Sequence, residues 1–260
     1  MVLSRIHELK AEMRWASLLT ASYLQRQRNP DAPWCNICGF CGEFADPTQG
    51  ANLRESLVCG LCRSRSRDRM LIYAMGTALG KKPPLRRWAT NLSFRVLETT
   101  GHGAHPTFLA AKFDYFNPRY DPERIAQGAD PRLFADVQNL PFDDEFFDCV
   151  LSSDVFEHVR LDHQGFSEIY RVLKRGGLFV LQAPFDGASV PTRVLVQPRG
   201  DEDFYLEPPQ YHARHTLVYR IYGQDLLSKL ESIGFKVEHL RTAVEQHKVS
   251  MQDTFSARKV

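Results

Sequence analysis

The chain has 260 residues, of which 43% are hydrophobic and 25% are charged, a composition typical of a soluble globular protein. Its net charge of +2, from 33 basic and 31 acidic residues, does not favour a dedicated nucleic-acid-binding protein, because such proteins usually carry a basic surplus. No apolar run reaches the roughly 20 residues of a membrane span, and the N-terminus lacks the apolar core of a signal peptide. We therefore expect a cytoplasmic protein with no membrane segment.

The first third of the chain is expected to hold two helices around a cysteine-rich segment. Apolar residues recur at helical spacings over 3–27, and prolines follow that stretch. A second helix is predicted over 66–79. We therefore expect an N-terminal helix at 1–33, followed at 34–92 by a small module and its linking helix.

Five of the six cysteines fall within one short segment, in two CxxC pairs with one extra thiol. Because a cytoplasmic context is reducing, metal binding is a better interpretation than disulfides, and two CxxC turns can complete a tetrahedral zinc site. A closed four-thiolate site has no open position, which favours a structural role. Spacing leaves open which two of the three candidates Cys35, Cys38 and Cys41 form the first pair, opposite Cys59 and Cys62.

An alternating basic run follows the cysteines, at Arg63, Arg65, Arg67 and Arg69. These side chains could contact phosphate. A solvated start of the helix, or salt bridges to the other domain, is the interpretation that we favour.

The pattern changes after residue 92, where short apolar segments alternate with helical ones. Strands are predicted at 94–97, 112–115, 132–135, 147–152, 177–183, 235–240 and 249–258, and the main helices at 162–174 and 223–233. Such alternation predicts an α/β fold with a doubly wound, mostly parallel sheet. We expect seven strands in a domain at 93–260, with an irregular substrate-side insertion at 186–214.

The first predicted strand of this domain ends in a glycine-containing turn, with Glu98, Gly101 and Gly103. Glycines there allow a ligand to approach the backbone closely, at the sheet edge where open α/β sheets bind ligands. Asp114 on the next strand could accept hydrogen bonds from ribose hydroxyls. Asp136, followed by Val137, ends the third predicted strand, where it could meet an adenine amino group.

Two longer stretches resemble a known family. LPFDDEFFDCVLSSDVFEHV (140–159) and EIYRVLKRGGLFVLQAP (168–184) are similar to the signatures of class I S-adenosylmethionine-dependent methyltransferases of the type 11 kind. The resemblance covers about 94–258 and implies a Rossmann-like sheet and S-adenosyl-L-methionine as cofactor. The chain departs from the usual first motif: Glu98 replaces an Asp, and His105 replaces the third glycine.

A narrower resemblance covers nearly the whole chain. Some bacterial members carry a CxxCG…CxxC ribbon, an Arg-rich helix and a Tyr-Gly-x-Asp segment similar to residues 218–226. The paired cysteines of those relatives correspond to Cys35 with Cys38 and Cys59 with Cys62. The resemblance therefore implies that these four bind Zn²⁺ and that Cys41 is spare.

Candidate catalytic residues are histidines near the expected pocket. His158 follows the fourth predicted strand, near Ser153 and Asp154, and is the nearest candidate base; packing and backbone bonding are the alternative for it. His215 lies in a second cluster, with Tyr205, Tyr211, His212 and Tyr219, which could line a substrate pocket or only pack on the sheet rim.

The sequence leaves three functions open. The first is a methyltransferase that acts on an O or N nucleophile of a small molecule, such as a natural-product or glycan intermediate. The second is an RNA methyltransferase that uses the ribbon and the arginine run. The third is a methyltransferase-like binding protein without catalysis. The oligomeric state is also open, with a dimer as one alternative.

Overall fold

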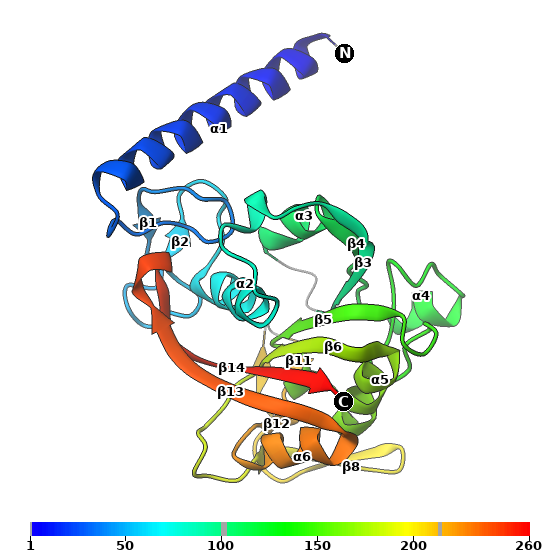
Figure 1. Ribbon diagram of the computed structural model, residues 1–260. Coiled ribbons are helices and arrows are strands. Elements are labelled where there is room, and N and C mark those ends of the chain that lie inside the picture. Colours follow the sequence, from blue (N-terminus) through cyan, green and yellow to red (C-terminus); the bar gives the residue numbers. More distant parts are fainter. Residues whose placement is uncertain (1, 100–102, 213–214) are drawn as a thin grey trace. The chain divides into compact units, whose positions relative to one another are not determined.

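The computed structural model describes residues 2–99, 103–212 and 215–260 (Figure 1). The chain divides into two compact units, each discontinuous in sequence. The first comprises Met1–Ala89, Gly103–Leu109 and Thr242–Gln252, and the second comprises Thr90–His102, Ala110–Arg241 and Asp253–Val260. The domain boundaries expected after residues 33 and 92 stay predictions.

A six-stranded sheet, most of it in the second unit, has the order β13-β14-β6-β5-β3-β4. Strand β3 pairs in parallel with β4 and with β5, and β5 pairs in parallel with β6, whereas β14 runs antiparallel to β6. The expected α/β fold with a mostly parallel sheet is confirmed. Its strands are β3 (Asn91–Glu98), β4 (Phe113–Phe116), β5 (Phe147–Ser153), β6 (Leu173–Gln182), β13 (Phe235–Val244) and β14 (Val249–Lys259).

The expectation of seven strands is wrong, because the segment predicted at 132–135 forms only an isolated parallel bridge between Arg119 and Phe134. Asx turns bound this segment. The Asp130 carboxylate accepts the N–H of Arg132 at 2.8 Å, and the Asp136 carboxylate accepts that of Gln138 at 2.8 Å. Short polar side chains that bond to nearby backbone groups compete with an extended ladder in this way.

The central strands form because their residues are apolar on both faces. Nearly every residue of β5 and every residue from 177 to 182 in β6 is buried, as expected for parallel strands that are covered on both sides. The helices α5 (Asp162–Val172) and α6 (Asp225–Ile233) each bury one stripe in this core, and Phe166 of α5 stacks on Phe156 with ring centroids 4.1 Å apart. A shorter helix, α4 (Pro122–Ala126), follows β4.

The segment predicted as an irregular insertion contains short antiparallel pairs. Strand β8 (Val196–Arg199) pairs with β9 (Glu202–Tyr205), and Gly200 takes a positive φ of 57° in their two-residue turn. Further pairs join β7 (Arg193–Val194) to β12 (Arg220–Ile221) and β10 (Tyr211–His212) to β11 (Thr216–Leu217). Contacts to the segment after β5 hold this region in place: Arg160 donates to Asp203 at 2.9 Å, and the Tyr219 N–H donates to Glu157 C=O at 2.8 Å.

The first unit contains the long helix α1 (Val2–Arg28), the helix α2 (Ser66–Ala78) and the pair β1 (Phe44–Ala45) and β2 (Val58–Cys59). Most of α3 (His105–Ala110) and a 3-10 turn at Leu85–Arg87 also belong to it. Among the residues described, no helix combines the length and the apolar character that a membrane span requires.

The two CxxC pairs sit on turns of the same design. The N–H of Gly39 donates to Cys35 C=O at 2.8 Å, and the N–H of Arg63 donates to Cys59 C=O at 3.0 Å. In each turn the donor has a positive φ, 86° for Gly39 and 65° for Arg63. The matching backbone path directs both cysteine pairs toward one point.

Candidate functional site

The carboxyl ends of β3 and β5 lie side by side where the winding of the sheet reverses. From β3 the chain passes to β4 on one side and then returns to β5 on the other, and open α/β sheets bind ligands in the crevice at such a point. A cavity of about 500 Å³ lies there. Its walls come from the segments after β3, β4 and β5 and from β11 onward: Thr99, Pro118, Tyr120, Ala135, Asp136, Val137, Gln138, Leu140, Asp154, Val155, His158, Val159, Arg160, Thr216 and Tyr219.

Three of the predicted cofactor-binding residues line this cavity, namely Asp136, Val137 and Asp154. Asp136 is held by its own Asx turn. Asp154 follows β5 directly and adopts a left-handed backbone with a φ of 55°, a conformation that is uncommon for residues other than glycine and that tends to cluster at functional sites. Two carboxylates therefore border the cavity: Asp136 in the segment between β4 and β5, and Asp154 directly after β5.

Glu98 and Ser153 are the last residues of β3 and β5, and both side chains are buried. The Tyr115 hydroxyl donates to the Glu98 carboxylate at 2.5 Å. Burial and the nearby Glu98 charge raise the pKa of Tyr115, so the phenol keeps its proton and remains a donor. Beside them the Thr99 hydroxyl donates to Ser152 at 2.9 Å, which ties the segment after β3 to β5.

The two glycines of the predicted cofactor turn are placed differently. Gly101 lies outside the described residues. Gly103 belongs to the first unit and has a φ of 117°, and a β-carbon there would lie 3.2 Å from a carboxylate oxygen of Asp68 and 3.1 Å from the His105 ring. The backbone conformation and the close neighbours both favour glycine at this position.

Asp114 lies away from the cavity lining, in an ion-paired group on β4. Its carboxylate is 3.2 Å from the Arg132 guanidinium and 3.7 Å from that of Arg95. Because Asp114 pairs in register with Arg95, it sits near the middle of β3 and not at its carboxyl end. The residue that follows β4 is Asn117, whose buried Oδ1 has no hydrogen-bond partner among the described residues. Sequence reasoning missed Asn117; its place as the first polar residue after the strand is the signal that could have found it.

His158 lines the cavity at the end of the 3-10 turn that follows β5. Its Nδ1 lies 2.7 Å from Leu217 C=O, and its Nε2 lies 3.1 Å from His212 Nδ1. Burial lowers the pKa of His158, which favours a neutral imidazole. With Nδ1–H donating to the carbonyl, the Nε2 lone pair points toward His212. The sequence predicted His158 as a candidate base but did not predict this partner.

The second predicted cluster is divided by the structure. Tyr219 lines the cavity, and its hydroxyl donates to Asp203 at 2.7 Å. Burial and this hydrogen bond raise the pKa of Tyr219 to about 12. Asp203 also accepts from Arg160 at 2.9 Å, so β9 is fixed to the cavity wall. In contrast, Tyr205, Tyr211 and His215 are exposed and lie outside the cavity lining.

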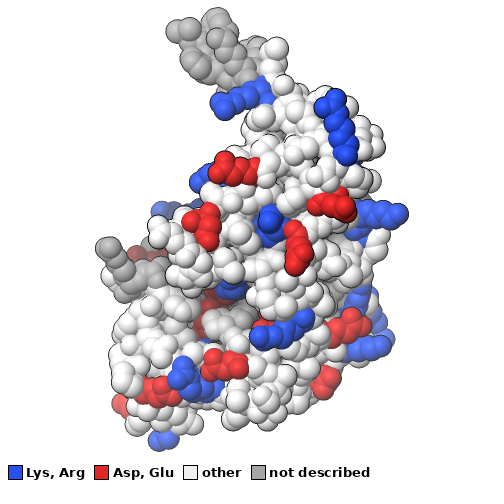
Figure 2. All heavy atoms as spheres, turned by 90° about the vertical axis from the view of Figure 1, so that its left-hand side faces the viewer, with Lys and Arg blue, Asp and Glu red and all other residues white. Residues whose placement is uncertain are grey.

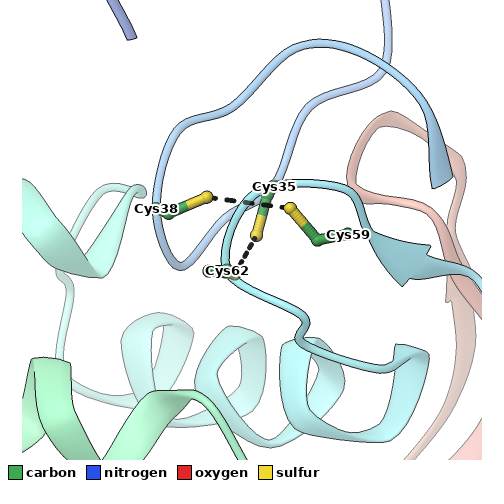
Figure 3. Close-up of side chains that lie close together, drawn as sticks. All are labelled: Cys35, Cys38, Cys59 and Cys62. Atoms are coloured by element: carbon green, nitrogen blue, oxygen red, sulfur yellow. Dashed lines mark hydrogen bonds between the residues drawn. The ribbon is translucent and has the colours of Figure 1, made fainter. Parts of the chain in front are cut away.

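The first unit brings together the four sulfurs of Cys35, Cys38, Cys59 and Cys62, which point toward one another (Figure 3). The sulfurs of Cys35 and Cys62 are 3.7 Å apart, and those of Cys38 and Cys59 are 3.8 Å apart. Four sulfurs arranged tetrahedrally at about 2.3 Å from one zinc ion are about 3.8 Å from each other. The donor set and its spacing therefore fit one Zn²⁺.

Cys41 lies apart from this cluster. It is buried against Ala32 and Trp34, and its carbonyl accepts a long hydrogen bond of 3.5 Å from Ser22. Its position agrees with the expectation that it is the spare thiol.

A buried polar network supports the cysteine cluster. The Ser64 hydroxyl lies 3.4 Å from the Cys35 sulfur and 3.2 Å from the Cys62 sulfur. The guanidinium of Arg69 is fully buried and donates to Ser64 and to the carbonyls of Leu57, His247 and Lys248. Outer partners of this kind orient metal-binding side chains. Burial lowers the pKa of Arg69, although the nearby thiolates oppose this shift.

Two further members of the arginine run form ion pairs within the same module, whereas Arg63 is exposed. Arg65 and Arg67 lie 3.1 and 3.2 Å from the Glu55 carboxylate, and Arg69 is buried. These salt bridges lie inside the first unit, whereas the sequence favoured either a solvated start of the helix or salt bridges to the other domain. On the face drawn in Figure 2, Lys and Arg side chains are interspersed with Asp and Glu and form no continuous basic patch.

Comparison with known proteins agrees with this geometry. Residues 100–181 match the family described as "Methyltransferase domain", a stretch that includes β5 and ends within β6. Ubiquinone/menaquinone biosynthesis C-methyltransferase UbiE of Ruegeria sp. (strain TM1040) is 36% identical over 104 residues, 37% of this chain and 41% of the relative. The chain thus matches less than half the length of that relative.

Solved structures show a looser similarity. The 1,6-didemethyltoxoflavin-N1-methyltransferase of Burkholderia thailandensis, solved with its substrate and S-adenosylhomocysteine, is 17% identical with a TM-score of 0.44, and the alignment covers 74% of this chain and 77% of that one. An S-adenosylmethionine-dependent methyltransferase of Mesorhizobium loti is 18% identical with a TM-score of 0.45, over 67% and 95% of the two chains.

Proposed function

We propose that the protein is an S-adenosylmethionine-dependent methyltransferase that methylates an oxygen or nitrogen nucleophile of a small molecule. The observation that carries the proposal is a coincidence of position. The methyltransferase domain match at residues 100–181 includes Asp136 and Asp154, which border the cavity at the carboxyl ends of β3 and β5. In an open α/β sheet this is where a nucleotide cofactor binds.

For this reaction the protein contributes mainly by aligning the two reactants and excluding water, and less by supplying catalytic groups. When bound, S-adenosyl-L-methionine would supply an electrophilic methyl group to a lone pair of the acceptor, and the acceptor would lose its proton to a base such as His158 or to water. S-adenosyl-L-methionine is already a strong electrophile, so the chain mainly positions the acceptor and excludes water.

The cofactor is assigned to the residues around the cavity. Asp136, Val137 and Asp154 would contact it directly, and Glu98 and Ser153 would shape the strand ends beneath it. The roles of Gly101, Gly103 and Asp114 stay predictions from the sequence.

Of the two candidate bases, His158 is the one that borders the cavity. Its Nδ1 contacts Leu217 C=O, and its Nε2 faces His212 Nδ1 at 3.1 Å. Nε2 would act on the acceptor either by accepting its proton once that contact opens or by holding a group that binds it. The catalytic role of His215, which is exposed, stays a prediction.

The cysteine cluster is assigned a structural Zn²⁺. The four thiols are all buried and converge within 4.8 Å, and a tetrahedral four-thiolate site has no open position for water. The ion would hold together two turns that have only the two-residue strands β1 and β2 between them and that form too small a core of their own.

A small-molecule acceptor is favoured by the cavity and by the state of the basic residues. About 500 Å³ is the size of pockets that enclose compact organic ligands, and Tyr120 and Tyr219 supply aromatic wall. The arginine run that could serve RNA is largely used in salt bridges and in the buried network.

Calorimetry with S-adenosylhomocysteine tests the proposal. We expect one binding site per chain, and about tenfold weaker binding for Asp136→Asn, since a cofactor hydrogen bond to a charged group contributes at least about 1.5 kcal/mol. Asp201→Asn, an exposed carboxylate in the β8–β9 turn, is the matched control and should bind like the natural chain. A folded natural chain that binds no S-adenosylhomocysteine would favour the non-catalytic binding protein and refute the proposal.

A further inference from the structure

We propose that Glu157, His158 and His212 form a binding site for one divalent transition-metal ion at the edge of the methyltransferase cavity. The site is separate from the four cysteines, and it lies wholly within the second unit. Glu157 and His158 come from the 3-10 turn after β5, whereas His212 comes from β10, more than 50 residues later in the chain.

The three potential ligand atoms form a compact triangle. His158 Nε2 is 3.1 Å from His212 Nδ1, and the Glu157 Oε1 atom is 3.6 Å from the former and 3.7 Å from the latter. Ligands at about 2.0–2.1 Å from a tetrahedral ion are about 3.3 Å from each other. The observed spacings fall on both sides of this value, so an ion fits with side-chain shifts of a few tenths of an ångström.

The backbone around the triangle holds its members in place. Nδ1 of His158 contacts Leu217 C=O at 2.7 Å, and metal-binding histidines usually donate their other N–H in this way. Leu217 lies on β11, which pairs with β10 through His212 and Thr216 and through Tyr211 and Leu217. The β10–β11 pair therefore supplies both a ligand and the carbonyl that orients the second ligand.

The charge of the group also favours a cation. Glu157 is fully buried, and a carboxylate removed from water requires compensating charge or strong hydrogen bonds. Two imidazole nitrogens lie 3.6 and 3.7 Å from the same Glu157 oxygen, so a cation between the three groups would have ligands on all of them. A divalent ion at the centre would place positive charge directly beside this buried carboxylate.

The donor set indicates the kind of ion. Two imidazoles and one carboxylate suit Zn²⁺, Fe²⁺, Co²⁺ or Ni²⁺, whereas Mg²⁺ and Ca²⁺ prefer sites built from oxygen alone. Three protein ligands on one side of an ion leave at least one position open. Because His158 and Thr216 line the cavity, the open position would be accessible to a ligand in the cavity.

The ligand class follows if the proposed methyl transfer is correct, and this step rests on that function. An acceptor with an oxygen donor, such as a phenol or a hydroxyl beside a carbonyl, would occupy the open position. The acceptor proton would then leave to water, because the Nε2 lone pair of His158 is used by the ion. The cofactor residues Asp136 and Asp154 are not part of the triangle, so the two parts can fail separately.

The site is tested by titrating Co²⁺ into protein that holds one zinc ion per chain, at the cysteines, and no excess zinc. Binding is monitored by calorimetry and by the visible absorption of Co²⁺. We expect one ion beyond those held by the cysteines, with nitrogen and oxygen ligation and without sulfur-to-cobalt charge-transfer bands. His212→Ala and His158→Gln should weaken its affinity at least tenfold. His163→Ala, an exposed histidine on α5, should leave it unchanged. His212 is itself exposed, so its replacement should not disturb folding.

Two results would overturn the metal site: no Co²⁺ bound beyond the cysteine equivalent in the natural chain, or equal affinity in the natural chain and His212→Ala. S-adenosylhomocysteine binding is measured in the same samples. If the natural chain binds S-adenosylhomocysteine but no additional ion, the metal site is refuted while the methyltransferase function stands. If it binds the ion but no S-adenosylhomocysteine, the function is refuted while the metal site stands.

Discussion

Arg69 is a buried charge on which the stability of the first unit should depend, and Arg69→Met tests this. Its guanidinium donates at 2.5–2.8 Å to the carbonyls of Leu57, Ser64, His247 and Lys248. Methionine has a similar apolar stem but no donor, so four carbonyls would lose their partner at once. Two of them belong to the segment that carries the cysteines and two to the loop before β14.

The expected cost follows from the burial of these bonds. Two of the four are buried and two are part-buried. A buried hydrogen bond to a charged donor contributes about 1.5–3 kcal/mol, water partly satisfies the part-buried carbonyls, and removing the charge recovers part of its desolvation cost. We expect the free energy of unfolding to fall by about 3–5 kcal/mol. This is a large share of the ~5–15 kcal/mol by which a typical domain is stable.

Urea unfolding at a fixed free zinc concentration, followed by circular dichroism and tryptophan fluorescence, measures this change. Arg65→Met is the matched control, since its contact with Glu55 is solvent-exposed and such pairs contribute only ~0–1 kcal/mol. The argument is refuted if the two variants unfold within about 1 kcal/mol of each other, because the buried network would then add nothing beyond a surface ion pair.

Two further predictions concern the cysteines and the segment before α6. Cys35→Ser should lose most of the cysteine-bound zinc, whereas Cys41→Ser should keep about one equivalent; metal analysis after dialysis decides, and full zinc in the Cys35 variant would show that the ligand set is wrong. Gly223→Ala should cost ~1–3 kcal/mol or more, because a β-carbon there would meet the Val190 carbonyl oxygen and the Pro191 backbone. Its neighbour Gln224→Ala, exposed and without a capping bond, should unfold like the natural chain, and equal midpoints would contradict the crowding.

Features encoded by local pattern could be read from the sequence. Strands β3, β5 and β6 are apolar runs, and α5 and α6 carry apolar stripes at helical spacing, so their presence and the parallel sheet were predictable. The CxxC pairs were equally legible, because a turn of that length brings its own two thiols together. The stretch from Leu140 to Pro184 gave the methyltransferase resemblance before any coordinates were known.

Predictions failed or stayed incomplete where short polar side chains compete with a regular element. The segment at 132–135 has apolar residues of strand type, yet the carboxylates of Asp130 and Asp136 bond to nearby backbone N–H groups and turn the chain. Asp114 carries a carboxylate, which is the right chemistry for a ribose contact. It lies opposite Arg95, however, and Arg95 is three residues before Glu98, where β3 ends at the ligand-binding crevice. Register between strands is a tertiary property that composition does not encode.

The cysteine segment and the run Glu157-His158-Val159 show which features the sequence determines and which depend on the tertiary structure. The sequence by itself determined which residues carry thiol, imidazole and carboxylate groups and on which local turn each one sits. Only the tertiary structure decided that Arg69 is buried beside the thiols while Arg65 is not, and that the β10–β11 pair places His212 next to Glu157 and His158. Local periodicity fixes elements because it acts within a few residues, whereas contacts across 50 residues depend on how whole elements pack.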